Sequence, residues 1–330
     1  MRVGVVGCGR HATSVLLPAL VQLGFDVAAV CARRLSSAQA AAARFGARAA
    51  YADPAAMLRR EGVEAVVACL PPSVYGEVVR ACVEARVPVF AEKPGAGGSA
   101  EAGRLAALSA EAGVPVMVGY MKRFAPAYRQ ARAALADPSF GAPSLATFTF
   151  VMGDMGVGLD DYLVDNPVHH LDLARFLLGE LHDLHVTRGR SDGGRHALSV
   201  AARAESGAVV SLQLGTTGSW QQHNESVEVF GTGSSVLVDN VDTCVLRPPE
   251  GAEQRWRPNY SIPDQVNTTV DTMGFGPALR HFQDVVRGSA TCESDLHSAA
   301  RTLALIDVIG DRLGLDRPVG RQAPAGEALG

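Results

Sequence analysis

The turn that follows the first apolar run constrains the fold of this chain most strongly. Its residues are Gly7, Cys8, Gly9, Arg10, His11 and Ala12. Glycine at position 7 permits a tight turn, glycine at position 9 lets the backbone approach a pyrophosphate, and a small residue at position 12 lets the next helix pack on the strand. The N-terminus of that helix would face the anion. The pattern predicts dinucleotide binding, with a purely structural glycine turn as the alternative.

Apolar runs alternate with segments of helical period through the first third of the chain. The predicted strands are Arg2–Val6, Asp26–Cys31, Ala47–Tyr51, Val63–Leu70, Val87–Ala91 and Val114–Tyr120. This alternation is typical of parallel βαβ units with helices on both faces of the sheet, so we expect residues 1–122 to form a Rossmann domain. Pro18 should make the first helix irregular, because proline removes a hydrogen bond. Asp53 and Pro54 predict a helix N-cap and first helical residue.

The rhythm changes after about residue 125. Predicted strands lie at Leu145–Met152, His182–Thr187, Ala197–Arg203, Ala208–Leu214, Ser226–Phe230 and Ser235–Val238, and helices at Pro126–Ala136, Pro167–Leu178, Ala278–Val286 and Leu296–Leu313. Short strands with tight turns indicate a large open, mixed or antiparallel sheet in an α+β domain over 123–330. The open face of this sheet needs a cover, which favours a homo-oligomer, a dimer or tetramer. The tail from Pro318 is expected to be loosely ordered.

Composition excludes several classes of protein. The chain is 47% hydrophobic and 19% charged with a formal charge of −4, which is typical of a globular enzyme. Its sequence has no cluster of basic residues for nucleic acid, and its six cysteines form no C-x-x-C pair for zinc or redox chemistry. It also has neither a leader peptide nor an apolar run of about 20 residues, so we expect a cytoplasmic protein without membrane contact.

The end of the second predicted strand bears on the choice of coenzyme. NAD enzymes commonly place an acidic residue there to bind the ribose 2′-hydroxyl. Here the strand runs into Ala32, Arg33 and Arg34, while Asp26 opens the strand at its other end. Because two arginines suit a 2′-phosphate, the sequence favours NADP. NAD is the alternative if the arginines stack on adenine or are simply solvated.

Three further stretches resemble one family of oxidoreductases over nearly the whole chain. They are Glu92-Lys93-Pro94, then Gly119–Phe124 with Pro126 and Tyr128, and finally Asp165–Asp172 followed by Arg175–Gly179. They are similar to the E-K-P, G-[FY]-x-x-R-F-x-P-x-Y and D-x-x-x-H-x-x-D motifs of the glucose-fructose oxidoreductase and inositol dehydrogenase family, Gfo/Idh/MocA. The chain departs from that family at Tyr75, where histidine is frequent, and in the segment from Gly153 to Val164, which we expect to be a loop that shapes the pocket.

The resemblance implies an NAD(P)-dependent enzyme that transfers a hydride between nicotinamide and a secondary alcohol or ketone carbon of a sugar, nucleotide sugar, aminosugar or cyclitol. It implies that Lys93 holds the reacting oxygen, that His169 exchanges the hydroxyl proton, and that Asp165 orients His169 or binds a neighbouring hydroxyl. The expected substrate-binding residues are Lys93, Tyr120, Asp165, His169 and His170, and the coenzyme contacts beyond the turn and the arginines are Leu70, Pro71, Tyr75, Glu92 and Lys93.

Several alternatives stay open at this point. His170 points about 100° away from His169 and faces either the core or the substrate. Asp172 either holds His169 or bonds across the domain junction. No metal is predicted at Asp165, His169, His170 and Asp172, because only their proximity supports it and no H-E-x-x-H motif is present. A non-catalytic NAD(P)-binding sensor and a redox-assisted glycosidase are the competing functions, since a fold does not fix a function.

Overall fold

The computed structural model describes residues 1–190, 192–221, 224–258 and 269–315. These residues form two compact units. The first contains Met1–Tyr120 and, later in the chain, Phe275–Leu303. The second contains Met121–Gly274 and, among the described residues, 304–315. The first unit therefore includes a C-terminal segment that the expected division at 122 had assigned to the second domain, and the expected loose tail from Pro318 lies outside the described residues.

The first unit is built on a six-stranded parallel sheet, as predicted. Its strands are β1 (Arg2–Val6), β2 (Asp26–Cys31), β3 (Ala49–Tyr51), β4 (Ala65–Ala68), β5 (Val89–Glu92) and β6 (Val116–Gly119). The strand order is β3-β2-β1-β4-β5-β6. The order reverses between β1 and β4, and doubly wound sheets bind ligands at this switch point, beyond the carboxyl ends of the strands.

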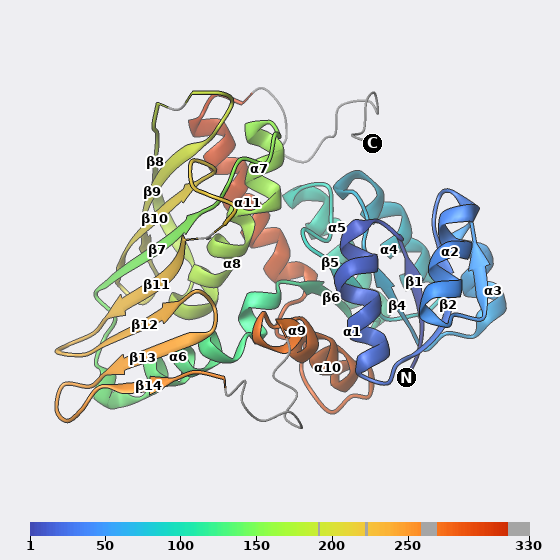
Figure 1. The fold of residues 1–330 in the computed structure, drawn as a ribbon, viewed down its shortest axis with the longest axis horizontal. Coiled ribbons are helices and arrows are strands. Elements are labelled where there is room, and N and C mark those ends of the chain that lie inside the picture. The colour runs from blue at the N-terminus through green and yellow to red at the C-terminus, as the bar shows by residue number, and fades with distance from the viewer. Residues whose placement is uncertain (191, 222–223, 259–268, 316–330) are drawn as a thin grey trace. The chain divides into compact units, whose positions relative to one another are not determined.

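Helices cover both faces of this sheet (Figure 1). One helical layer consists of α1, α2 and α10, and the layer on the other face consists of α3, α4 and α5. Their bounds are Leu17–Gln22 (α1), Leu35–Phe45 (α2), Pro54–Glu61 (α3), Tyr75–Glu84 (α4), Ser99–Ala112 (α5) and Phe275–Val286 (α10), with short helical turns at Ala12–Leu16 (η1) and Pro72–Val74 (η2).

Two local predictions in this unit are confirmed. The turn η1 before Pro18 is π-helical, with the Leu17 N–H bonded to the Ala12 carbonyl, so the helix is irregular where proline interrupts its bonding. Asp53 caps α3, and its carboxylate accepts hydrogen bonds from the N–H groups of Ala55 and Ala56 at 2.9 and 3.1 Å.

The C-terminal segment joins the first unit because it pairs with β6. The Val118 N–H donates to the Ser294 carbonyl at 2.6 Å, and the Ser294 hydroxyl donates to the Val118 carbonyl at 2.7 Å. In the helix before this segment, the ring of Phe282 packs edge-on against Phe90 of β5, with centroids 5.7 Å apart. These contacts cover an edge strand that would otherwise be exposed.

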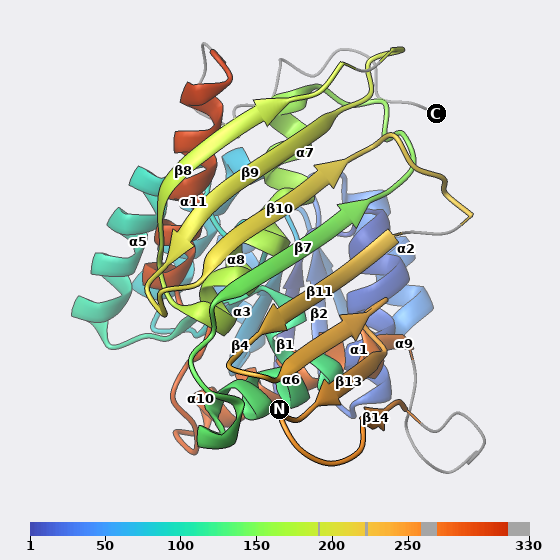
Figure 2. The same ribbon diagram turned by 90° about the vertical axis from the view of Figure 1, so that its left-hand side faces the viewer.

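The second unit contains an eight-stranded mixed sheet, shown face-on in Figure 2. Its strands are β7 (Leu145–Val151), β8 (Leu181–Arg188), β9 (Ala197–Ala204), β10 (Val209–Gly215), β11 (Asn224–Phe230), β12 (Ser235–Asp239), β13 (Thr243–Arg247) and β14 (Gln254–Trp256). The order is β14-β13-β12-β11-β7-β10-β9-β8, with β7 and β10 parallel and the other neighbours antiparallel. The sheet confirms the expected fold class.

Helices pack on one face of this sheet, α6 against β12 and β13, and α8 against β7. The helical segments are η3 (Met121–Phe124), α6 (Pro126–Ala136), η4 (Pro138–Phe140), α7 (Leu159–Asp165), α8 (Pro167–Leu178), α9 (Thr269–Thr272) and the end of α11 (Leu296–Arg312). The segment 159–164, expected as a loop, is a helix. Among the described residues, no helix combines the length and the apolar character that crossing a membrane requires.

Candidate dinucleotide and catalytic site

The glycine turn has the geometry that a dinucleotide requires. Gly7 has a φ of +99°, and a Cβ atom there would lie 2.0 Å from the Cys69 carbonyl oxygen, so this backbone accepts only glycine. A Cβ at Gly9 would meet no atom within 4 Å, so packing does not explain that glycine. Room beside the backbone at the start of a helix is what a pyrophosphate needs. Ala12 is fully buried, as its packing role predicts.

The other residues of the turn lie close to β2 and β5. The Cys8 thiol is 3.7 Å from the Cys31 carbonyl, and burial raises the pKa of Cys8. Arg10 and His11 are exposed in the first helical turn. The His11 Nε2 atom lies 3.6 Å from the Glu92 Oε1 atom, which links the turn to the end of β5.

The E-K-P motif lies at the carboxyl edge of the sheet. Glu92 is the last residue of β5 and is buried, and its Oε2 accepts the Lys93 N–H at 3.1 Å. Lys93 follows it, half-buried. Burial, with a further contribution from Glu92, raises the pKa of the nearby Cys69 thiol to about 12. Lys93 therefore lies at the sheet edge where the sequence predicted it, and its catalytic role stays a prediction.

The loop after β4 is shaped by Tyr75. Its side chain is fully buried, and its hydroxyl accepts a hydrogen bond from the Leu70 N–H at 3.1 Å. Burial raises the pKa of Tyr75 well above its usual value. Leu70 is half-buried and Pro71 is exposed at the same edge. The buried Tyr75 side chain thus fixes the loop through its hydrogen bond to Leu70. A direct contact of Leu70, Pro71 or Tyr75 with the coenzyme stays a prediction.

The residues after β2 carry positive charge, which favours the binding of an anionic group. Arg33 and Arg34 are exposed just beyond Cys31, next to Ala32. Asp26 lies at the other end of the strand, paired with Arg48 at 2.9 and 3.0 Å, and this hydrogen bonding lowers the pKa of Asp26.

Asp53, the N-cap of α3, is a second carboxylate near the end of β2. It follows β3, which pairs with β2 through Tyr51 and Cys31. Burial raises the pKa of Cys31 to about 12, with further contributions from Cys8 and Asp53. Both oxygens of Asp53 are engaged by the backbone N–H groups of α3.

The D-x-x-x-H motif lies in the second unit, across the break between α7 and α8. Asp165 ends α7 and is exposed, Asn166 precedes α8, and Pro167 is its first residue. His169 is half-buried on the first turn of α8, and its backbone N–H donates to the Asn166 carbonyl at 3.0 Å. Burial, helped by Asp160 and Asp165, raises the pKa of Asp161. The pairing of Asp165 with His169 stays a prediction.

The two residues with open roles, His170 and Asp172, face the interior. His170 is fully buried, stacks on Phe150 with ring centroids 4.4 Å apart, and places Nε2 at 3.5 Å from Glu225 Oε1. Asp172 binds Arg123 with both oxygens, at 2.5 and 2.6 Å. Asp172 therefore pairs with the arginine of the junction motif. Tyr120, which ends the N-terminal segment of the first unit, is also buried.

Two features of the second unit carry no signal in the local sequence. One is Glu225 on β11, which contacts Lys122 and Tyr128 as well as His170. The other is the anchoring of the segment before α7. The Trp220 indole N–H donates to the Asp154 carbonyl at 2.7 Å, and His196 Nε2 lies 2.9 Å from the Val157 carbonyl. Both sets of partners are tens of residues apart in the chain.

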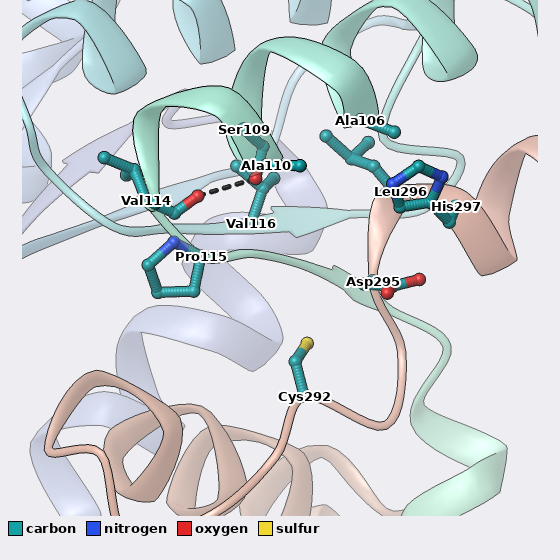
Figure 3. A pocket seen from close by; sticks show the side chains of 11 residues that line it. Ala106, Ser109, Ala110, Val114, Pro115, Val116, Cys292, Asp295, Leu296 and His297 are labelled. Carbon is teal, nitrogen blue, oxygen red and sulfur yellow. Dashed lines mark hydrogen bonds between the residues drawn. The ribbon is translucent and has the colours of Figure 1, made fainter.

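One cavity of the first unit lies away from this site. A cavity of about 300 Å³ in the first unit is lined by α5, the segment leading into β6, and the start of α11 (Figure 3). Ser109 there donates to the Val114 carbonyl at 2.6 Å. Val114 precedes β6, so this cavity lies at the amino end of the strand, away from the ligand edge. Within the described ranges, no group of three or more His, Cys, Asp or Glu residues could hold a metal.

The doubly wound sheet with a glycine turn at its switch point defines a dinucleotide-binding Rossmann protein. Residues 1–120 match the sequence model of Gfo/Idh/MocA, described as an oxidoreductase family with an NAD-binding Rossmann fold. This match bears out the resemblance seen in the motifs: over residues 1–120 the chain is similar to the Gfo/Idh/MocA oxidoreductases.

Individual relatives extend this match along the chain. The myo-inositol 2-dehydrogenase of Thermotoga maritima is 26% identical over 277 residues, which cover 76% of this chain and 79% of that protein. An inositol 2-dehydrogenase of Mycolicibacterium gilvum is 29% identical over 342 residues, 97% of each chain. The crystal structure of a dehydrogenase from Chromobacterium violaceum has the same fold, with a TM-score of 0.85 and 24% identity over 94% of both chains.

Proposed function

We propose that this protein is an NADP-dependent dehydrogenase or ketoreductase that acts on a secondary alcohol of a cyclitol or a related sugar. The observation that carries the proposal is the dinucleotide turn together with Lys93 at the end of β5, on the ligand edge of the sheet. The similarity to inositol dehydrogenases, which spans 97% of the chain in one case, supports a polyhydroxylated substrate.

The roles of the residues follow from the chemistry of alcohol oxidation. The nicotinamide, when bound, accepts the hydride from the carbinol carbon. Lys93 offers an ammonium group that binds and polarises the reacting oxygen. His169 in its neutral form takes the hydroxyl proton, and Asp165 orients His169 or a neighbouring hydroxyl. In the reverse direction, His169 returns the proton to the alkoxide.

A substrate screen tests this function. The purified protein is mixed with inositols, pentoses, hexoses, aminosugars and nucleotide sugars, with each coenzyme in turn, and nicotinamide absorbance is followed. We expect stoichiometric coenzyme reduction with at least one cyclitol or sugar. Tight coenzyme binding without turnover of any substrate would favour a sensor. Cleavage of a glycoside without net coenzyme reduction would identify a redox-assisted glycosidase.

We expect NADPH to bind more tightly than NADH, because Arg33 and Arg34 are exposed beyond β2 while Asp26 and Asp53 are engaged elsewhere. A charged hydrogen bond to phosphate contributes about 1.5–3 kcal/mol, which corresponds to about 10-fold to 100-fold in affinity. Arg33→Asp should remove much of this preference. Calorimetric titration with both coenzymes measures it, with Arg44→Asp, exposed near the other end of α2, as the control. Equal affinities, or tighter NADH binding, in the wild type would contradict the assignment.

We also infer that the protein forms a homo-oligomer through the face of the eight-stranded sheet that α6 and α8 leave uncovered. The neighbouring residues Leu145 and Val209, paired in the register of β7 and β10, are 45% and 47% exposed. Apolar side chains side by side on a sheet surface favour association. Light scattering after size-exclusion chromatography should give a dimer or tetramer that Val209→Glu weakens, with Arg104→Glu, exposed on α5 of the first unit, as the control. A monomeric wild type at micromolar concentration would contradict this inference.

A further inference from the structure

We propose that Glu225 is a positioning residue, whose buried carboxylate fixes the first turn of α8 and thereby His169. The inference rests on the proposed function, because the position of His169 matters for activity only if His169 transfers the proton. It is carried by contacts within the second unit alone.

One oxygen of Glu225 accepts hydrogen bonds from two helical elements and lies close to a side chain of a third. Glu225 Oε1 accepts from Lys122 Nζ of η3 at 2.5 Å and from the Tyr128 hydroxyl of α6 at 2.8 Å. The Nε2 atom of His170, on α8, lies 3.5 Å from the same oxygen. All four side chains are at least nine-tenths buried. The carboxylate on β11 thus bonds η3 and α6 to the sheet and lies against His170 of α8.

The first turn of α8 depends on this anchor because its own cap is weak. Asn166 makes no side-chain hydrogen bond to the N–H groups of the helix, and its amide instead donates to the Met155 sulfur. A side-chain cap of this kind would stabilise the first turn of the helix. His170, packed beside Glu225 and stacked on Phe150, is adjacent to His169 in the chain.

Stability alone explains this cluster poorly. A buried ion pair is often no more stabilising than apolar residues of similar volume, whereas a satisfied polar network fixes geometry. Lys93 and Lys122 are the two lysines of a chain that is otherwise rich in arginine. The ammonium group of Lys122 is compact and fits a closed, buried space, whereas the guanidinium group of an arginine is larger and planar.

The charges of the cluster are consistent with a fixed arrangement. Burial alone would raise the pKa of Glu225, but Lys122 and His170 hold it far below its usual range. Burial lowers the pKa of His170, against the opposing effect of Glu225. Burial raises the pKa of Tyr128, and Glu225 and Asp239 raise it further. Near neutral pH the carboxylate is therefore ionised, the imidazole is neutral and the phenol keeps its proton.

The test compares Glu225→Gln with Glu180→Gln. Glu180 is the matched control because it binds Arg175, in the last turn of the same helix, at 2.7 and 2.8 Å. Two readouts are taken: the ring ¹⁵N signals of His169 and His170 by NMR across a pH titration, and kcat and KM on the substrate found in the screen. Tyr128→Phe, which removes one hydrogen bond, replaces Glu225→Gln if the latter does not fold.

We expect Glu225→Gln to move the His169 titration and the His170 tautomer signals, and to lower kcat by about 10-fold or more, because small misplacements of a catalytic group are costly. KM for the coenzyme should change little, and Glu180→Gln should leave all signals near wild type. Unchanged His169 signals in folded Glu225→Gln, or equal effects of both variants, would overturn the proposal. If the wild type turns over no substrate, the proposed function fails, while the NMR readout still decides the role of Glu225.

Discussion

Replacing Lys93 with alanine should lower kcat by about 10²-fold or more, while coenzyme binding and Tm stay close to wild type. The expected size of the loss follows from the effect of removing one charged group that stabilises a reacting oxygen. Lys93 is half-buried just beyond β5, so its side chain is not part of the sheet core. Steady-state kinetics and coenzyme titration of the variant measure the two quantities separately.

Two further variants sharpen the Lys93 prediction. Lys93→Arg keeps the charge but replaces a compact ammonium group with a larger planar guanidinium group, so we expect this variant to recover little of the rate. Arg104→Ala removes an exposed cation from α5 and should retain full activity. If Lys93→Ala stays within a few-fold of wild-type turnover, Lys93 does not hold the reacting oxygen.

His169→Asn should slow alcohol oxidation by about 10²-fold to 10⁴-fold and remove the ascending limb of the pH-rate profile. In the wild type, the oxidation rate should rise with pH as His169 loses its proton, because only the neutral ring accepts the hydroxyl proton. The profile is measured at saturating coenzyme, so that coenzyme binding does not mask the chemical step.

His170→Asn and His185→Asn serve as comparisons. His170 is buried against Glu225, so its loss should reduce the rate but keep the ascending limb. His185 is exposed on β8 and should be replaceable without effect. An inactive His170→Asn beside a His169→Asn with the wild-type profile would place the catalytic imidazole one residue along the helix and refute the present assignment.

The parts of the fold that were predictable are those with a strong local pattern. The strands of the first sheet are short apolar runs between helical segments, and α6 and α8 begin at Pro126 and Pro167, where proline is favoured at the first helical position. The strands β13 and β14 were not predicted; β14 in particular has glutamine and arginine before a single tryptophan, and so shows neither an apolar run nor an alternation. The segment that became α7 follows three glycines within six residues, which made a loop the natural expectation.

The site was predictable only where its residues lie in motifs. Gly7, Glu92 and His169 could each be placed on a turn, a strand end or a first helical turn. The partners of Glu225 could not, since Tyr128 and Lys122 are 97 and 103 positions away and no local pattern links them. The return of the segment from Phe275 to the first unit is likewise a tertiary event, decided by its pairing with β6.

Hydride transfer between the substrate carbon and the coenzyme is the central claim, and isotope transfer tests it most directly. A cyclitol or sugar identified in the screen is prepared with deuterium on the carbinol carbon and oxidised by the wild-type enzyme with NADP. We predict that the reduced coenzyme carries one deuterium per ketone formed, on a single face of the nicotinamide ring. Ketone formation with no deuterium in the reduced coenzyme would contradict the account.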